Sequence, residues 1–496
     1  MIQGSIPNSI FELVSLEILR LLSNNLSVVV EHDIFCKLKN LTYLNLSRNG
    51  LSLLTKSSST INSNVNTCPR LQYLECSSCN ITEFPDFLKT QEDLKVLDLS
   101  NNKIQGDIPK WEKDIGKDSL YYLNLSGNLL TGVLDLQWKN LQYIHLHSNK
   151  FEGPAPIMPP FAHVHLILNN NFTGEMPSII CMLASLQILD LSYNSLSGEI
   201  QRCFKNLSDR LSVLDPRSNK LHGTLPSNFG KCCSLRTLVL NGNQLGGQLS
   251  PSLLNCQGLE VHDVGNNNFN GTFPYWLGSL PELQVLILHS NSFRGNVGTF
   301  KRKHLFSKLW IFDISNNSFN GTLPSSFLQC FKAMMNSTEN RGKLKYLGKS
   351  FYEYSIMPKV KRLNLEFVRI LTVITAINIS NNKLKGEIPE VIGDLVSPRW
   401  LNLAHNNFIG RIPPSLASLS ELESLDLSSN KLVGQIPEEL ASLTSLEFFN
   451  VSQNRLVGPI PQGQQFGTFE NNSYLGNLWL YGNLLSKKCG DDEAPL

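Results

Sequence analysis

Apolar residues recur along this chain at intervals near 24 residues. Near its end, two apolar residues separated by one position are followed three residues later by asparagine, and this happens three times in succession: Leu401 and Leu403 before Asn406, Leu425 and Leu427 before Asn430, Phe449 and Val451 before Asn454. Because side chains alternate along a strand, the apolar pair points inward and its neighbours point outward. The pattern predicts one short strand per repeat, stacked on the next repeat in a parallel sheet.

The complete unit, L-x-x-L-x-L-x-x-N-x-L-x-G-x-I-P, occupies 422–437. It is a leucine-rich repeat and resembles the plant extracellular type, which implies an α/β fold: a right-handed solenoid with a parallel concave β-sheet and a mostly irregular or 3-10 convex side. The asparagine bonds to main-chain groups of neighbouring coils, where each unpaired buried group would cost about 1–3 kcal/mol. Seventeen such ladder positions are found: Asn24, Asn49, Cys79, Asn102, Asn128, Asn149, Asn170, Asn194, Asn219, Asn243, Asn267, Asn291, Asn317, Asn382, Asn406, Asn430 and Asn454.

The spacing of the ladder breaks once, where 65 residues separate Asn317 from Asn382. We predict an inserted, non-repeating segment at about 331–369. A solvated linker is the alternative, but the segment is rich in large apolar residues, which favours an ordered flap on the repeat surface. These residues are Phe351, Tyr352, Tyr354, Ile356 and Leu363.

Composition narrows the function. The 496 residues are 17% charged, carry a net charge of +2 and contain no acidic or basic block, which excludes a nucleic-acid-binding protein. The sequence has no G-x-S-x-G, H-E-x-x-H or phosphate-loop motif, so we expect neither an enzyme nor a cofactor. It opens on the second half of a repeat, without a leader, and has no run of 18 apolar residues. We therefore expect an extracellular fragment or a truncated product.

The eleven cysteines do not form a dense framework. Cys68, Cys232 and Cys256 each lie eleven residues before a ladder position, and we predict that they are small buried packing residues. Cys76 and Cys79 form a C-x-x-C motif, but Cys76 takes the place of an inward leucine and no second pair follows at zinc-site spacing. We predict no metal there.

Outward positions of the strands are the candidate ligand-binding residues. Aromatic rings with a polar tip suit protein recognition, although strand propensity alone would also place tyrosine there, and we leave both explanations open. The candidates on the concave face are Tyr43, Tyr73, Tyr122, Tyr143, His145, His147, Arg217 and His289.

Four histidines raise a metal-site alternative. If Asn169 rather than Asn170 were the ladder residue, His163 and His165 would line the same face as His145 and His147, and the four imidazoles could hold zinc or copper. We favour solvated histidines in a ligand-contact patch, and a pH-sensitive patch is a third alternative.

Asn-x-Ser/Thr sequons indicate a secreted glycoprotein, although the repeat itself produces sequons such as those at Asn45 and Asn124 inside its strands. We predict glycosylation at Asn25, Asn40, Asn80, Asn171, Asn206, Asn270, Asn320, Asn336 and Asn471.

The repeat variant, the insertion before the last four repeats and the closing run from 458 to 489 closely resemble plant receptor-like proteins of the Cf disease-resistance type. The resemblance covers essentially the whole chain and implies the ectodomain of a plasma-membrane protein in defence or developmental signalling. Such an ectodomain binds a peptide or protein ligand on its concave face and pairs with receptor kinases through the insertion and last repeats. Uniformly small residues after the insertion, together with this resemblance, predict the kinase contacts Tyr352, Ser380, Ala404, Ser428 and Ser452.

The resemblance divides the chain into four parts. About 13 repeats fill 1–330, the insertion covers 331–369, four repeats fill 370–458, and 459–496 form a degenerate cap and the start of an acidic stretch. The cap motif of the family is replaced by the residues at 479–482, which leaves Cys489 without its partner, so we expect this end to fray. Two alternative functions are a soluble inhibitor of a secreted pathogen hydrolase and a truncated, non-signalling relic.

Overall fold

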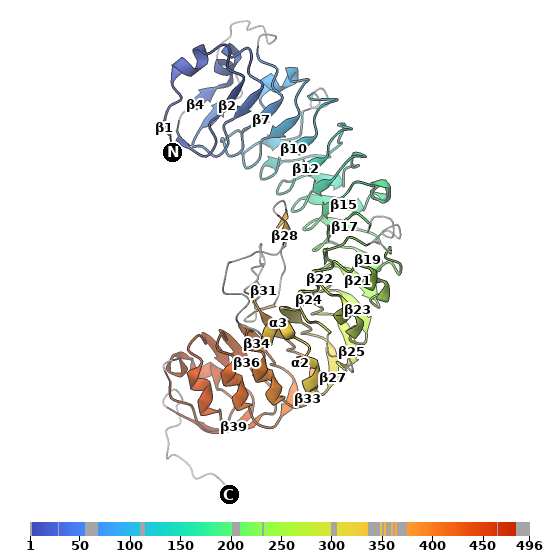
Figure 1. Cartoon of the computed structure of the whole chain (residues 1–496), viewed down its shortest axis with the longest axis vertical. Helices are drawn as coiled ribbons and strands as arrows, with labels where there is room; N and C mark the ends of the chain where they lie inside the picture. The colour runs from blue at the N-terminus through green and yellow to red at the C-terminus, as the bar shows by residue number, and fades with distance from the viewer. Residues whose placement is uncertain are drawn as a thin grey trace. The chain divides into compact units, whose positions relative to one another are not determined.

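A computed structural model describes residues 2–27, 29–54, 68–109, 115–200, 209–230, 233–298, 305–335, 348–349, 352–353, 359–360, 363–364, 374–463 and 465–482. The chain forms two compact units, Met1–His222 (unit 1) and Gly223–Leu496 (unit 2). Both units consist of stacked coils (Figure 1). The predicted leucine-rich-repeat solenoid is confirmed.

The described part of unit 1 contains nine main strands, each three residues long and parallel to its neighbours. They are β2 (Ile18–Arg20), β5 (Tyr43–Asn45), β7 (Tyr73–Glu75), β8 (Val96–Asp98), β10 (Tyr122–Asn124), β12 (Tyr143–His145), β14 (Val164–Leu166), β16 (Ile188–Asp190) and β18 (Val213–Asp215). The central residue of each strand points into the coil: Leu123 of β10 is fully buried, while Tyr122 and Asn124 on either side of it are partly exposed. The alternation predicted from the apolar pattern is therefore present.

Most coils of unit 1 continue into a second strand of two to five residues. These strands are β1 (Gln3–Gly4), β3 (Asn25–Leu26), β4 (Val29–Glu31), β6 (Ser52–Leu54), β9 (Gln105–Gly106), β11 (Leu129–Leu130), β13 (Glu152–Pro154), β15 (Asn171–Glu175) and β17 (Ser195–Ser197). Short 3-10 helices return the chain to the next main strand: η1 (Asn8–Glu12), η2 (His32–Lys37), η4 (Asp86–Thr90) and η6 (Ser178–Met182).

Unit 2 repeats this plan with eight described main strands: β20 (Thr237–Val239), β22 (Val261–Asp263), β24 (Val285–Ile287), β26 (Ile311–Asp313), β32 (Ala376–Asn378), β34 (Trp400–Asn402), β36 (Ser424–Asp426) and β38 (Phe448–Asn450). Its second strands are β21 (Gln244–Gly247), β23 (Asn268–Gly271), β25 (Ser292–Asn296), β27 (Ser318–Gly321), β33 (Lys383–Glu387), β35 (Asn407–Ile409), β37 (Val433–Gly434), β39 (Arg455–Pro459) and β40 (Trp479–Tyr481). The strand β19 (His222–Thr224) spans the boundary between the units.

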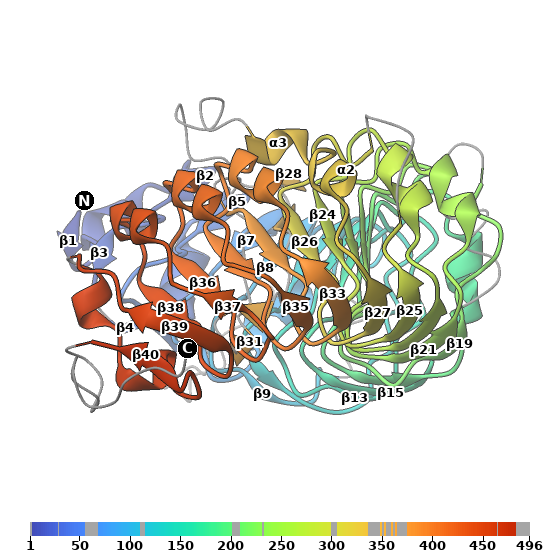
Figure 2. The same ribbon diagram turned by 90° about the horizontal axis from the view of Figure 1, so that it is seen from below.

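Helices of unit 2 are equally short. They are η7 (Pro251–Asn255), η8 (Tyr275–Ser279), α2 (Ser325–Leu328), α3 (Lys332–Met335), η9 (Glu390–Asp394), η10 (Pro414–Ser418), η11 (Glu438–Ser442), η12 (Phe466–Thr468) and η13 (Asn471–Ser473). Figure 2 shows α2 and α3 on the side of the coils away from the second strands. Two residues of the repeat unit shape the path of the backbone between the second strand and the following helix. Gly434 has a φ of 79°, which favours glycine, and Pro437 adopts an extended conformation directly before η11.

The ladder asparagines bond as predicted, and Asn406 shows how. Its Nδ2 donates to the carbonyl oxygens of Ile379 (3.0 Å), Leu403 (3.2 Å) and Ala404 (3.1 Å), and its Oδ1 accepts from the amide of Leu384 at 3.1 Å. One amide thus satisfies main-chain groups of two coils.

The ladder also has two variations. At the one cysteine position, Cys79 Sγ lies 3.4 Å from the carbonyl of Leu46, which is the bond that an amide would make. An eighteenth ladder residue, Asn477, was not recognised in the sequence. It donates to Val451 O (3.0 Å) and Tyr474 O (2.8 Å) and accepts from Leu456 N, within the segment interpreted as a degenerate cap.

The inserted segment does not interrupt the sheet of unit 2. Strand β26 pairs directly with β32, so that Phe312 lies opposite Ile377 although the insertion separates them along the chain. The base of the insertion is held by α3, where Ser397 N donates to Met334 O at 3.0 Å. Two short antiparallel pairs belong to the insertion: β28 (Gly348–Lys349) with β29 (Tyr352–Glu353), and β30 (Lys359–Val360) with β31 (Leu363–Asn364). Most of the predicted flap, including Phe351, Tyr354 and Ile356, lies outside the described residues.

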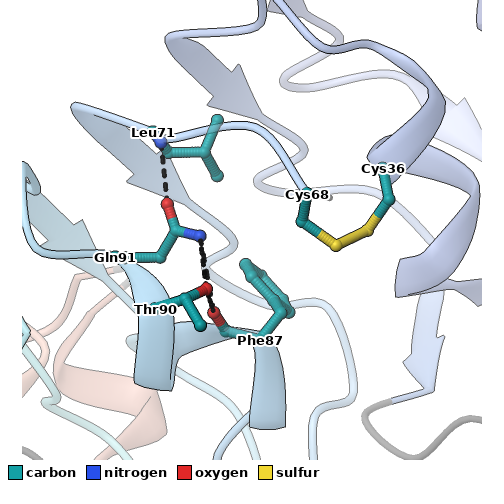
Figure 3. Close-up of a disulfide and its surroundings, with 6 residues drawn as sticks. All are labelled: Cys36, Cys68, Leu71, Phe87, Thr90 and Gln91. Atoms are coloured by element: carbon teal, nitrogen blue, oxygen red, sulfur yellow. Dashed lines mark hydrogen bonds between the residues drawn. A yellow bond between two sulfur atoms is a disulfide. The ribbon is translucent and has the colours of Figure 1, made fainter. Parts of the chain in front are cut away.

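The prediction that the cysteines only fill space is wrong for two of the three positions named. Cys36 is bonded to Cys68, and Cys256 to Cys233, across 32 and 23 residues of chain. Cys181 is also disulfide-bonded, and Cys232 lies outside the described residues. Figure 3 shows Cys36–Cys68 near the Gln91 side chain, which accepts from Leu71 N at 2.7 Å. Stacking brings equivalent positions of successive coils together, so cysteines about one repeat apart meet.

No helix in the described part of the chain is long and apolar enough to cross a membrane.

Candidate functional site

A row of aromatic side chains runs across the sheet of unit 1. The residues at the first position of β5, β7, β8, β10 and β12, here called the tyrosine row, are Tyr43, Tyr73, Val96, Tyr122 and Tyr143. They lie opposite one another in strand register and are all partly exposed. The rings pair within the row: Tyr43 stacks on Tyr73 at a centroid distance of 5.2 Å, and Tyr122 lies 6.1 Å from Tyr143. All four predicted tyrosines therefore share one surface.

Polar partners fix the first end of the row. Tyr43 Oη donates to Glu75 Oε1, and Asn45 Nδ2 donates to Glu75 Oε2 at 2.9 Å. The guanidinium of Arg20 lies 4.2 Å from the centroid of the Tyr43 ring. Burial, followed by the hydrogen bond to the Glu75 carboxylate, raises the pKa of Tyr43. The phenol is therefore a neutral hydrogen-bond donor at physiological pH.

At its other end the row continues into two histidines. The ring of His145 lies 5.4 Å from Tyr122, and the ring of His163 stacks on Tyr143 at 6.1 Å. Desolvation, with the nearby Asp98 carboxylate, raises the pKa of Tyr122 to about 12. Desolvation also lowers the pKa of His145 to about 4 and lowers that of His147. His145 therefore stays uncharged near neutrality, which argues against the pH-sensitive alternative for this residue.

The four-histidine metal site requires a register that the structure does not have. Asn170 is the ladder residue, bonding to Leu146 O and Ile167 O at 3.1 Å each, while Asn169 occupies the preceding left-handed turn position (φ 55°). His165 consequently points into the coil, fully buried in the place of a leucine. No group of three or more potential ligands from His, Cys, Asp and Glu occurs among the described residues.

Two predicted ligand contacts are buried instead. Arg217 is 2% exposed, and its Nε donates to the Asp215 carboxylate at 2.9 and 3.0 Å. His289 is 1% exposed, with Nδ1 3.2 Å from Ser290 Oγ. Sequence periodicity gave the direction of both side chains but not how deeply they are covered. They do not belong to the exposed surface formed by the tyrosine row.

The predicted kinase contacts are also buried: Ser380 is 9% exposed, Ala404 2%, Ser428 1% and Ser452 8%. Each donates its backbone N–H to a side-chain oxygen two residues earlier, as Ser428 does to Asp426 Oδ1 at 3.0 Å. This tight turn accounts for small residues at these positions without any partner. Of the fifth predicted contact, Tyr352, the structure describes the backbone in β29 but not the side chain.

Most predicted glycosylation sites are exposed asparagines: Asn25, Asn40, Asn80, Asn171, Asn270, Asn320 and Asn471. Asn206 and Asn336 lie outside the described residues. In contrast, three sequon asparagines that we did not select are buried, namely Asn45 (4%), Asn378 (6%) and Asn450 (6%). Exposure thus agrees with the selection in part, because Asn316, which we did not select, is also exposed, and glycosylation itself stays a prediction.

Sequence reasoning missed the charged residues around the row. Glu75 and Asp98 occupy the third positions of β7 and β8, two residues after Tyr73 and Val96, so they share the outward face with the tyrosines. His163 and Arg20 stack on its ends. Comparing the third residue of each strand, in the same way as the first residue, would have identified both carboxylates.

Comparisons with known proteins agree with this architecture. Leucine-rich-repeat family models match residues 399–456 and the segments 93–113, 185–207, 234–256, 308–330 and 373–395. Receptor-like protein 6 of Arabidopsis thaliana is 45% identical over 476 residues, which cover 94% of this chain and 47% of that protein. Receptor-like protein 34 of the same plant is 42% identical over 493 residues, covering 98% and 48%.

Two solved structures resemble the chain along nearly its whole length. One is PEPR1–AtPEP1, with a TM-score of 0.70, 26% identity, and coverage of 96% of this chain and 64% of that chain. The other is the Arabidopsis receptor kinase HAESA in complex with the peptide hormone IDA and the co-receptor SERK1, with a TM-score of 0.70, 28% identity, and coverage of 96% and 76%.

Fold and surface thus define a leucine-rich-repeat protein of the plant receptor class, built to present the faces of stacked strands. More specifically, the chain belongs to the plant receptor-like proteins. It spans about half the length of the curated relatives it matches, or less.

Proposed function

We propose that this chain is the ligand-recognising repeat region of a receptor-like protein in plant defence or developmental signalling. It binds a peptide or protein ligand on the sheet face of unit 1 and pairs with receptor kinases at the outer membrane surface. The role is one of binding rather than catalysis. The single observation that carries the proposal is the partly exposed tyrosine row, flanked by Glu75 and Asp98.

The row has the properties of a protein-recognition surface. Tyrosine offers a large apolar area and a hydroxyl group at a small cost in side-chain entropy, and such residues often dominate binding energy. The stacking of Tyr43 on Tyr73 and of Tyr143 on His163 restricts the rings before any ligand arrives, which lowers the entropy lost on binding. The two solved neighbours are described as complexes with AtPEP1 and IDA, which supports a peptide as one kind of ligand.

Pairing with a receptor kinase requires an exposed surface on the last repeats, and the second strands of unit 2 supply one. Ile409 is 48% exposed, Val433 41%, Val457 36% and Trp479 44%, on the successive strands β35, β37, β39 and β40. Ile409, Val433 and Val457 directly precede the glycine of the repeat, and in most preceding repeats the residue at that place is polar, for example Arg294 or Lys385. We propose this lateral surface for the kinase contact, in place of the four buried residues.

The ligand assignment is tested by exchanging surfaces. The outward residues of β5 to β12 are transplanted into a full-length receptor-like protein of different, known specificity, leaving all inward residues unchanged. Recognition in plant tissue should then follow the transplanted surface. A matched exchange of the outward residues of η4 and η6, on the other side of the coils, serves as the control. If the chimaera keeps the specificity of its host, the ligand surface lies elsewhere.

The pairing surface is tested separately. Val433→Arg and Val457→Arg, in a full-length membrane-anchored background, should abolish co-precipitation with kinases of the SERK1 kind while ligand binding persists. Lys431→Ala, on an exposed neighbour, is the control. Unchanged co-precipitation of both arginine variants would exclude the lateral surface.

A further inference from the structure

The tyrosine row has a gap at Val96. Strands of a sheet lie about 4.8 Å apart, so Tyr73 on β7 and Tyr122 on β10 stand roughly 9–10 Å from each other on either side of β8. Between them the row carries only the short Val96 side chain. Two ring faces at this separation leave room for one flat group, since aromatic and guanidinium planes stack at about 3.5–4 Å.

Both walls of the gap are supported from behind. Tyr43 stacks on Tyr73 with ring planes 28° apart, and Tyr143 lies against Tyr122 with His163 stacked behind it at an angle of 15°. The rings are therefore packed against neighbours in the same row. A gap with such supported walls can keep its width without a ligand.

One side of the gap is acidic. Asp98 lies two residues after Val96 on the same strand face, and Glu75 lies opposite Asp98 on the adjacent β7. Asp98 Oδ1 accepts from Ser100 N at 2.9 Å, and Glu75 accepts from Tyr43 Oη and Asn45 Nδ2. Burial raises the pKa of Asp98, while hydrogen bonds from Ser100 and Asn124 and the charge of the exposed Arg48 lower it by a smaller amount. A carboxylate that loses water on burial gains from a cation placed beside it.

The unit already shows how a cation fits this row. The guanidinium of Arg20 lies over the ring of Tyr43 at 4.2 Å, at the first end of the row, on the side away from Tyr73. A guanidinium is attracted by the negative face of an aromatic ring, and more strongly where the contact excludes water. At the gap above Val96 a cation can contact two tyrosine rings, those of Tyr73 and Tyr122, and two carboxylates lie beside them.

We propose that the gap between Tyr73 and Tyr122 is a binding site for a cationic side chain, arginine above lysine, of the ligand. The guanidinium stacks between the two phenol rings above Val96 and directs its N–H groups to Asp98 and Glu75. Arginine fits better than lysine because its planar group uses both rings and can donate two parallel hydrogen bonds to a carboxylate. The inference rests on the proposed function, because it names the ligand chemistry read by the same surface.

The test uses the whole chain and two synthetic probes. These are the peptide acetyl-Gly-Gly-Arg-Gly-Gly-amide and the same peptide with citrulline, which keeps the shape of arginine and removes its charge. Binding is measured by saturation-transfer NMR and titration. The arginine peptide should bind at least about fivefold more tightly than the citrulline peptide, equivalent to about 1 kcal/mol for the cation.

Three variants locate the site. Val96→Tyr fills the gap and should weaken the arginine peptide at least about tenfold, because a ring replaces the space for the guanidinium. Asp98→Asn keeps the shape of the side chain and removes its charge, and it should weaken binding of the arginine peptide about fivefold. Ile188→Tyr, at the same strand position on β16 beyond the row, is the matched control and should leave binding unchanged. Hydrogen exchange of the sheet verifies that each variant is folded.

The outcomes separate the inference from the proposed function. Equal affinity for arginine and citrulline, no measurable binding of either peptide, or full binding by Val96→Tyr and Asp98→Asn would overturn the cation site. If the surface exchange transfers recognition and the arginine peptide fails, only the cation site is wrong. If the arginine peptide binds at Val96 and the exchange fails, the proposed ligand surface is wrong and the cation site stands.

Discussion

The two units place different side chains at the same position of the repeat. In unit 1 the first outward position of the main strands carries the tyrosine row, whose members are partly exposed. In unit 2 the same position on β22, β24 and β26 carries Val261, Val285 and Ile311, which are 0%, 0% and 1% exposed. An outward direction therefore does not by itself make a recognition surface. On β5 to β12 of unit 1 the sheet face has the character of a protein surface, and on β22 to β26 of unit 2 it has the character of a core. The division does not follow the unit boundary throughout, because Val213 of unit 1 is 1% exposed whereas Trp400 and Phe448 of unit 2 are partly exposed.

The polar residues of the two faces follow the same division. His289, predicted as a ligand contact, lies beside the aliphatic face of unit 2, and its burial is that of its neighbours rather than a property of histidine. Tyr143 and His145, predicted by the same rule, remain accessible because their neighbours are accessible. Burial is thus shared by a whole stretch of the face.

The largest expected effect comes from placing a charge on each face. Val285→Asp puts a carboxylate at a fully buried position and should destabilise unit 2 by about 3–5 kcal/mol. Val96 occupies the equivalent position of unit 1 and, like Val285, stands two residues before another outward residue of its strand. Because Val96 is partly exposed, Val96→Asp should destabilise unit 1 by about 1 kcal/mol or less. Hydrogen exchange of β22 to β26 and of β7 to β10 measures the two effects. Equal losses would remove the distinction between the faces.

A smaller effect is expected for the side chains that point into the coils, which are buried in both units. His262 in unit 2 is fully buried, and burial lowers its pKa from 6.5 to about 4. The unfolded chain then binds a proton below pH 6.5 that the folded chain does not bind until about pH 4. Stability is highest above pH 6.5 and falls as the pH drops through this window, by roughly 3 kcal/mol for a shift of that size.

His262→Leu should remove this dependence from unit 2, which denaturant midpoints between pH 7 and pH 4 would show. His165→Leu should do the same in unit 1, because burial lowers the pKa of that imidazole to about 3. His405→Asn, at an exposed turn position, is the control and should leave the acid profile as it is. An acid profile that is identical in the parent and His262→Leu would contradict the assignment.

The smallest effect concerns the tyrosine row itself. Tyr43→Leu removes the stack on Tyr73, the contact with Arg20 and the hydrogen bond to Glu75, and should cost about 1 kcal/mol because the site is partly exposed. Tyr43→Phe keeps the ring and should lose less than half of that. Thermal unfolding measures both changes. A loss of several kcal/mol for Tyr43→Leu would mean that the row is a structural core like the face of unit 2.

The repeating part of the fold could be predicted from sequence because its forces act between neighbours along the chain. The apolar pair Leu425 and Leu427 faces inward, and Asn430 bonds to Leu427 O and Leu403 O, as the period implies. The period is also why the strand register could be assigned from Tyr43 to Tyr143 without a structure.

Features that depend on more than the period could not be predicted. Whether Arg217 is accessible depends on what covers its strand, which no local pattern records. The bond between Cys233 and Cys256 depends on stacking, and the cysteines had been compared with ladder positions rather than with each other. The burial of Ser428 in a turn, where its hydroxyl donates to Asp426 Oδ1, could not be predicted from the spacing alone. The carboxylates of the site were missed because the third strand position, where His145 was noticed, was not compared from strand to strand.

The direct pairing of β26 with β32 has a consequence for how this architecture tolerates change. The inserted segment leaves and re-enters the coil at two points that are already neighbours, with Phe319 N bonded to Asn382 Oδ1 at 3.0 Å across 63 residues. The entropy of closing such a loop grows only logarithmically, by about 0.6 kcal/mol for each doubling of its length. The solenoid can therefore accept segments of very different length and sequence here at almost constant stability. That makes this junction a place where a repeat receptor can acquire new contacts without rebuilding its coils.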